Sequence, residues 1–201
     1  AELSGIIVED DPVHTYLKEI GQVPLLTAEQ EIWLATQMSA ARVLERLTRD
    51  AAEDLDADDQ DQLRVRTMVQ NYANFLENWA CAQEASDVIG VDPPDLMAMV
   101  DEARLLRQNW RDGSDSYVRQ YLKNGNWGQD EVWTDLAECV FNMFTSLYLL
   151  PNELVQRLTE YYAAENKLPD PDIFQEWMDE NEIALEYNAF MVYHLAEEAK
   201  A

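Results

Sequence analysis

The chain has 201 residues and a net charge of −26, because 40 aspartate and glutamate residues stand against 14 lysines and arginines. Hydrophobic residues make up 47% of the sequence, with six Trp and nine Tyr, which is more than a disordered chain of this charge carries. The composition therefore predicts a folded protein with a sizeable core, and it excludes the basic whole-chain signature that is typical of nucleic-acid-binding domains.

The first structured segment after an irregular leader is predicted to be a short helix. Asp11 is a good N-cap residue, and Pro12 occupies the first helical position, where its missing N–H has no cost. Gly21 can adopt the left-handed conformation that ends a helix. The apolar residues of this helix recur at helical spacing and define one side of it: Val13, Tyr16, Leu17 and Ile20.

A second, longer helix begins at Thr27. Gln30 lies three residues further on, so the pair has the spacing of a capping box. The apolar positions of this helix continue as Leu34, Met38, Ala41, Leu44 and Leu47. The pattern stops in residues 49–61, where acidic residues dominate and large apolar residues are rare, so we expect a solvated linker there. The acidic residues of this linker do not have the spacing of a calcium-binding EF-hand loop.

The remainder of the chain consists of segments with helical periodicity, separated by Gly and Pro. No stretch alternates with period two, and no repeat of fixed length is visible, so we predict an all-α fold, a multi-helix bundle. We expect the apolar and aromatic stripes of these helices to form the core, with residues 133–148 at its centre. The predicted segments are 65–86, 92–112, 117–124, 133–148, 151–162, 173–178 and 183–195, the last with Ile183, Tyr187, Phe190, Met191, His194 and Leu195 on its apolar side.

Cys81 and Cys139 are the only cysteines, and both lie among apolar residues of helical segments. We interpret them as two buried thiols in a reducing compartment, in preference to a disulfide or a metal site. The sequence contains neither a signal-peptide pattern nor an apolar run long enough to cross a membrane. We therefore expect a cytoplasmic protein that does not bind membranes.

No catalytic site can be identified from the residues. The two histidines, His14 and His194, belong to no metalloprotease pattern, and the chain has no phosphate-binding glycine loop and no nucleophile-elbow motif. The sequence thus predicts a protein that is not an enzyme and that uses no metal, no cofactor and no small-molecule ligand.

The N-terminal segment resembles conserved region 1.2 of primary-type bacterial sigma factors of the sigma-70 family. The shared pattern is DPV-x-x-YL-K-E-I-G, a short bridge, and PLLT-x-E-x-E-I-x-LA, which extends without a gap over residues 11–35. This resemblance implies a role in transcription initiation, with RNA polymerase core enzyme and promoter DNA as partners.

In that family, region 1.2 contacts the single-stranded non-template strand of the discriminator, just downstream of the minus-ten element. The resemblance places this contact on His14, Tyr16, Leu17 and Lys18. A tyrosine or an aliphatic side chain can stack on an unpaired base, and a lysine can bind a phosphate. His14 stands where relatives usually carry arginine, which weakens the positive charge of the site. The alternative for Tyr16 and Leu17 is that they pack on Val13 and Ile20 in the core.

A second stretch, EYNAFMVYHLA at residues 186–196, is similar to the start of region 2.1, although Glu197 and Glu198 replace the basic residues that usually follow. The resemblance implies that the acidic residues between the two stretches form the variable insertion of primary sigma factors, and that the chain is a fragment or a diverged relative that lacks regions 2.2 to 2.4. The expected organisation, within one structural domain, is a leader (1–10), a region 1.2-like helical hairpin (11–48), an acidic linker (49–62), a helical insertion (63–180) and the start of a region 2.1-like helix (181–201).

The charge alone supports a different function. An acidic, all-helical protein-interaction module, such as an adaptor or a DNA mimic, would bind a basic surface of a partner. Most of the negative charge lies outside residues 1–46, so it does not prevent a local DNA contact within a Debye length of about 8 Å. Both hypotheses remain open at the level of sequence.

Overall fold

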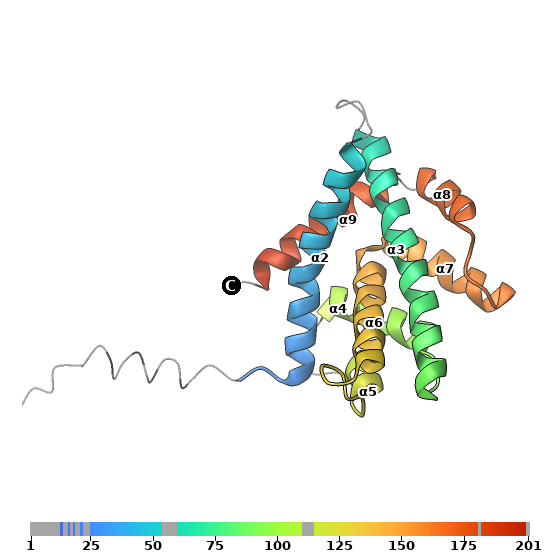
Figure 1. The fold of residues 1–201 in the computed structure, drawn as a ribbon. Coiled ribbons are helices and arrows are strands. Elements are labelled where there is room, and N and C mark those ends of the chain that lie inside the picture. Colours follow the sequence, from blue (N-terminus) through green and yellow to red (C-terminus); the bar gives the residue numbers. More distant parts are fainter. Residues whose placement is uncertain are drawn as a thin grey trace, which may run out of the picture.

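The computed structural model describes residues 13, 16, 18, 21, 25–53, 60–109, 115–180 and 182–199. This part of the chain contains eight packed helices and no strand, which confirms the all-α prediction (Figure 1). The helices are α2 (Ala28–Ala52), α3 (Gln60–Ile89), α4 (Leu96–Asn109), α5 (Tyr117–Leu122), α6 (Glu131–Leu149), α7 (Asn152–Glu165), α8 (Pro171–Asp179) and α9 (Glu182–Glu198).

Local sequence signals determine several helix starts. The backbone N–H of Thr27 donates to Oε1 of Gln30 at 2.8 Å, and the N–H of Gln30 donates to Oγ1 of Thr27 at 3.3 Å, which confirms the predicted capping box. Asp130 caps α6 in a similar way, since its carboxylate accepts from the N–H of Trp133 at 3.0 Å. These bonds satisfy N–H groups that a helix start otherwise leaves unpaired.

The helices on both sides of the acidic segment are longer than the sequence indicated. Helix α2 continues to Ala52, with Ala51 buried, and α3 already begins at Gln60. Both helices thus extend into the range 49–62. Burial of Ala51 stabilises the last turn of α2. Residues 54–59, the centre of the predicted linker, lie outside the described residues.

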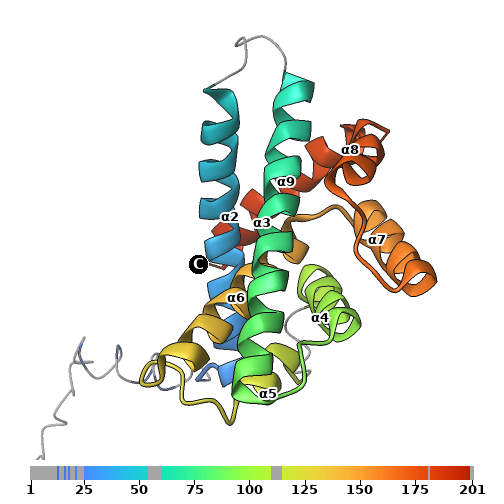
Figure 2. The ribbon, with the colours of Figure 1, turned by 45° about the vertical axis from the view of Figure 1, so that its right-hand side comes forward.

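Helix α6 lies at the centre of the core, as its apolar sequence predicted. It packs against α2, α3, α4 and α9, and α8 packs on the far side of α3. Figure 2 shows α2 and α3 side by side, with α9 crossing behind them. The buried residues of α6 that fill the centre are Leu136, Ala137, Val140, Met143, Phe144, Leu147, Tyr148 and Leu149.

The prediction of two unpaired thiols was wrong. Cys81 of α3 and Cys139 of α6 form a disulfide, with their Cα atoms 6.3 Å apart. Both cysteines lie in helical, apolar surroundings as expected, but the close packing of α3 on α6 places them opposite each other. The sequence separation of 58 residues gave no sign of this pairing.

The predicted core side of α9 was also wrong in part. Tyr187, Phe190 and His194 were assigned to the core, but all three are exposed. The helix instead buries Leu185, Asn188, Val192 and Ala196 against the bundle. Both sets of residues have helical spacing, and contacts with α2, α3 and α6 decide which side is buried.

None of the helices in the described ranges has the length and apolar character needed to cross a membrane.

Candidate nucleic-acid interface

Helix α2, which follows the predicted DNA-contacting residues, is fixed to the bundle by a buried polar link. The indole Nε1–H of Trp33 donates to Oε1 of Glu102 on α4 at 2.8 Å. The other carboxylate oxygen, Oε2, accepts from the backbone N–H of Val118 on α5 at 2.9 Å. Glu102 therefore joins three helices through one buried carboxylate, and charge-assisted hydrogen bonds of this kind are among the stronger ones.

The first turn of α2 has a second attachment to α5. The guanidinium of Arg119 donates a hydrogen bond to the carboxylate of Glu29. The backbone amide at the helix start and the guanidinium of Arg119 lower the pKa of Glu29 below its usual value. Acidic residues are favourable in the first turn because they face the positive end of the helix dipole. The start of α2 is thus fixed in position relative to α4 and α5.

The end of α6 and the last helix are joined by Asn188. Its side-chain amide donates to the backbone carbonyl of Leu149 at 2.6 Å, and Asn188 is buried. Glu186, one residue before Tyr187, forms an ion pair with Arg64 of α3 at 3.5 Å. Since α9 also packs on α2, the segment around Glu186–Ala196 and the segment after Thr27 lie side by side (Figure 2).

The residues predicted to contact DNA are described only in part. Tyr16 is helical and 61% exposed, and Lys18 is helical and exposed as well. His14 and Leu17 lie outside the described residues. Tyr16 is therefore not packed in the core, which was the alternative interpretation for this residue, and its ring is accessible to a ligand.

The exposed residues have complementary chemistry for a single strand. Tyr16 offers an aromatic face, and Lys18 offers an ammonium group. Because residues two apart do not share a helix face, the ring and the ammonium point to different sides of the helix. A flexible single strand can contact both side chains, since its bases and its phosphates extend in different directions. The described residues contain no cluster of His, Cys, Asp and Glu that could hold a metal ion.

The N-terminal part of the chain, which includes Tyr16, Lys18 and the first half of α2, matches a known protein family. Residues 11–42 match the family model Sigma-70 factor, region 1.2. The match implies a role in sigma-factor transcription initiation, in which factors of this family bind RNA polymerase core and promoter DNA. The matched region 1.2 ends within α2, so it includes Glu29 and Trp33. Helices α4 and α5, which provide the partners of these two residues, lie outside the matched region. No solved structure matches the chain significantly.

Trp33 and the distant partners of α2 could not be recognised in the sequence. Trp33 occupies a position that the shared pattern leaves open, and Glu102 is one of 40 acidic residues. The only available signal for Trp33 was its helical spacing with Gln37 and Ala40, which are buried on the same side of α2. The partners Glu102 and Arg119 are 69 and 90 residues away from the α2 residues that they bind.

Proposed function

We propose that this chain acts in transcription initiation as part of a sigma factor, and that its region 1.2 contacts the non-template strand of the discriminator. The observation that carries the proposal is the region 1.2 match over residues 11–42. Within it, Tyr16 stacks on an unpaired base and Lys18 binds a backbone phosphate. His14 and Leu17 complete the proposed contact.

The arrangement of the helices supports this proposal. The two stretches that resemble regions 1.2 and 2.1 are far apart in sequence, but α2 and α9 pack on each other. If two regions of a sigma factor pack on each other, an insertion between them must begin and end at nearby points in space. Helices α3 to α8 connect α2 to α9 in this way. Residues 49–180 are accordingly proposed to be the acidic insertion of the factor.

The negative charge is compatible with DNA binding when it is held away from the strand. Exposed charges further away than a Debye length of about 8 Å are largely screened at physiological salt. We propose that the acidic body also reduces binding of the unassembled factor to DNA, because a net charge of −26 repels phosphates. The protein-interaction module remains the second candidate function, and the net charge is the observation that favours it.

A binding experiment with single-stranded DNA tests the contact. The 201-residue chain is titrated into a fluorescent strand of about 12 nucleotides, which is long enough for several base contacts, and anisotropy is measured at several salt concentrations. Tyr16→Ala is expected to weaken binding about tenfold, because one stacked base is lost. Lys18→Ala is expected to reduce the slope of log K against log salt by about 0.7, the value for one phosphate of a single strand.

Two matched substitutions serve as controls. Trp127→Ala removes another exposed aromatic residue, and Lys123→Ala removes another exposed lysine, both in the segment that follows α5. If the controls weaken binding as much as Tyr16→Ala and Lys18→Ala do, the proposed contact is wrong.

The role in transcription is tested with RNA polymerase core and promoter DNA. The intact factor with Tyr16→Ala and Lys18→Ala together is expected to bind the core normally but to open the promoter less, as measured by permanganate reactivity of the melted strand. Normal promoter opening by the double variant would contradict the proposal, and so would a general loss of stability.

A further inference from the structure

The exposed large apolar residues of the described chain are concentrated in two places. One is residues 13–26, with Val13, Tyr16, Leu25 and Leu26. The other is α9, where Tyr187 is 65% exposed, Phe190 64% and Tyr193 42%. The other three, Val88, Met97 and Trp127, are scattered over different elements. Concentrated apolar exposure marks interaction sites, whereas single exposed residues are normal.

Helix α9 is apolar on two sides. Leu185, Val192 and Ala196 are buried in the bundle, and the aromatic residues lie on the side that faces solvent. We call Tyr187, Phe190, Tyr193 and His194 the aromatic ridge. The rings of Phe190 and His194 are stacked, with centroids 6.1 Å apart and an angle of 22° between the planes. A helix with apolar residues on both sides is typical of a position between two packing partners.

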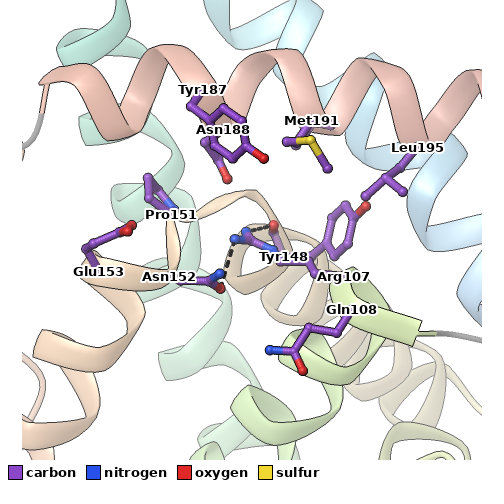
Figure 3. Close-up of a pocket in the computed structure, with 11 residues that line it drawn as sticks. Arg107, Gln108, Tyr148, Pro151, Asn152, Glu153, Tyr187, Asn188, Met191 and Leu195 are labelled. Atoms are coloured by element: carbon purple, nitrogen blue, oxygen red, sulfur yellow. Dashed lines mark hydrogen bonds between the residues drawn. The ribbon is translucent and has the colours of Figure 1, made fainter.

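A pocket lies on each side of the ridge. The first, of about 190 Å³, is formed by α9, the end of α4 and the junction of α6 and α7. Figure 3 shows Tyr187, Met191 and Leu195 of α9 on one wall and Pro151 and Asn152 opposite them. The second pocket, of about 150 Å³, lies between α2, α3 and α9 and includes Tyr193. The ridge is thus flanked by two cavities that can each accept a side chain of a partner.

The charges beside the ridge are mostly negative. Helix α9 itself exposes Glu186, Glu197 and Glu198, and its sequence has no lysine or arginine. Glu153 lines the first pocket beside Tyr187. Burial and the negative charge of Glu45 on α2 raise the pKa of Tyr193. Glu45 therefore adds negative charge near Tyr193, next to the second pocket. The field therefore favours a cationic partner and disfavours phosphates.

The two arginines that line the pockets are already engaged. Arg64 pairs with Asp61 at 2.7 Å and with Glu186 at 3.5 Å. Arg107 donates to the carbonyl of Tyr148 and to Oδ1 of Asn152 (Figure 3). Burial lowers the pKa of Arg107 to about 10, so it stays charged at neutral pH. Both guanidinium groups therefore already have acceptors within the chain.

We propose that the aromatic ridge of α9 is a docking surface for an amphipathic helix of a partner protein whose apolar side is bordered by lysine and arginine. The apolar side chains of the partner pack on the ridge and enter the two pockets, and its cations face Glu45 and Glu153. Two copies of this chain are a less suitable pair, because each carries a net charge of −26. The proposal is independent of the region 1.2 assignment.

The test uses a synthetic peptide as the probe. A labelled peptide of about 18 residues, or five helical turns, carries Leu at i, i+3, i+4 and i+7 spacing and Lys at the other positions. It is titrated with the 201-residue chain and with Phe190→Ser, Tyr193→Ser and the double variant. Each single substitution is expected to weaken binding about tenfold, the effect of losing an aromatic anchor.

A matched substitution and two further peptides separate the ridge from general acidity. Val88→Ser alters an equally exposed apolar residue on α3, 69% exposed, and is expected to change affinity less than twofold. A peptide with Glu in place of Lys is expected not to bind. A peptide with Ser in place of Leu is expected to bind weakly and equally to all variants. Glu45→Gln with Glu153→Gln is expected to reduce the salt dependence of binding to the original peptide.

Three results would overturn the proposal. In the first, Val88→Ser and Phe190→Ser change peptide binding equally, so that the ridge has no special role in attracting the peptide. In the second, the ridge variants lose affinity for a single-stranded oligonucleotide, which assigns the ridge to nucleic acid. In the third, sedimentation shows a dimer of the unaltered chain that Phe190→Ser abolishes, which assigns the ridge to a second copy.

Discussion

The described residues of the segment 13–26 and helix α9 both expose large apolar side chains, but they differ in the charges beside them. Tyr16 is followed by the exposed Lys18, whereas Tyr187 follows Glu186 and shares a pocket with Glu153. An aromatic ring can pack on a base or on a protein side chain equally well. The neighbouring charge is therefore what distinguishes the two proposed partners, a nucleic acid strand at the first surface and a basic helix at the second.

The two surfaces also depend on different buried polar residues. Helix α2, next to the first surface, is fixed by Glu102, which accepts hydrogen bonds from Trp33 and Val118. Helix α9, which carries the second, is fixed by Asn188 through the carbonyl of Leu149. Substituting one of these residues at a time should affect one surface more than the other.

The largest effect is expected from Glu102→Ala. The substitution leaves the indole N–H of Trp33 and the N–H of Val118 buried without an acceptor, and each such group costs about 1–3 kcal/mol. We expect the free energy of unfolding, measured by urea denaturation, to fall by about 3 kcal/mol. DNA binding should fall more than binding of the basic peptide to α9.

The control for this change is Glu102→Gln, which keeps the size of the side chain and one acceptor oxygen. It should lose less stability than Glu102→Ala, because one of the two N–H groups keeps its acceptor while the amide NH2 faces the other. Equal losses in the two variants would show that the hydrogen bonds to Trp33 and Val118 are not what fixes α2.

A smaller effect is expected from Asn188→Ala. The carbonyl of Leu149 loses a hydrogen bond that is inaccessible to water, so the free energy of unfolding should fall by about 1–2 kcal/mol. Peptide binding to the aromatic ridge should weaken, while DNA binding stays within twofold. Asn124→Ala, at an exposed position after α5, should change neither quantity. If Asn188→Ala weakens DNA binding and peptide binding equally, Asn188 does not act on α9 alone, and the proposed separation between Glu102 and Asn188 is wrong.

The smallest effect concerns the pH dependence of the first turn of α2. The folded-state pKa of Glu29 is lowered from 4.5, so its ionised carboxylate stabilises the fold above this pH. This stabilisation is lost as the pH falls through the lower folded value. Arg119→Gln should raise the pKa of Glu29 toward 4.5, as measured by NMR titration. Arg157→Gln, which removes the distant pair with Glu180, should leave the pKa of Glu29 unchanged; a shift there would mean that net charge, not Arg119, sets the value.

Much of the fold could be predicted because it depends on neighbouring residues. The capping box of Thr27 and Gln30, the proline before α7 and the end of α5 before Gly125 are all local signals, and the structure has them as expected. The apolar character of residues 133–148 likewise identified α6 as the central helix.

The failures concern contacts between distant residues. Periodicity identified α9 as a helix, but it could not show that Val192 faces the bundle and Phe190 the solvent, because both belong to apolar stripes. The disulfide and the partners of Trp33 depend on how helices pack, which no spacing rule records. At the candidate site, the sequence pattern located Tyr16 and Lys18 within region 1.2, but it could not indicate that Glu102 and Arg119 fix the following helix.

The link between Cys81 and Cys139 makes a covalent ring of the chain from α3 to α6. Glu102, Val118 and Arg119, the groups that bind α2, are all members of this ring, whereas α9 lies beyond it. A cross-link restricts mainly the residues that it encloses, so the ring remains tethered even when the bundle opens. Helices α2, α7, α8 and α9 lie outside the ring, and only noncovalent contacts hold them against it, so they can detach while the ring stays closed.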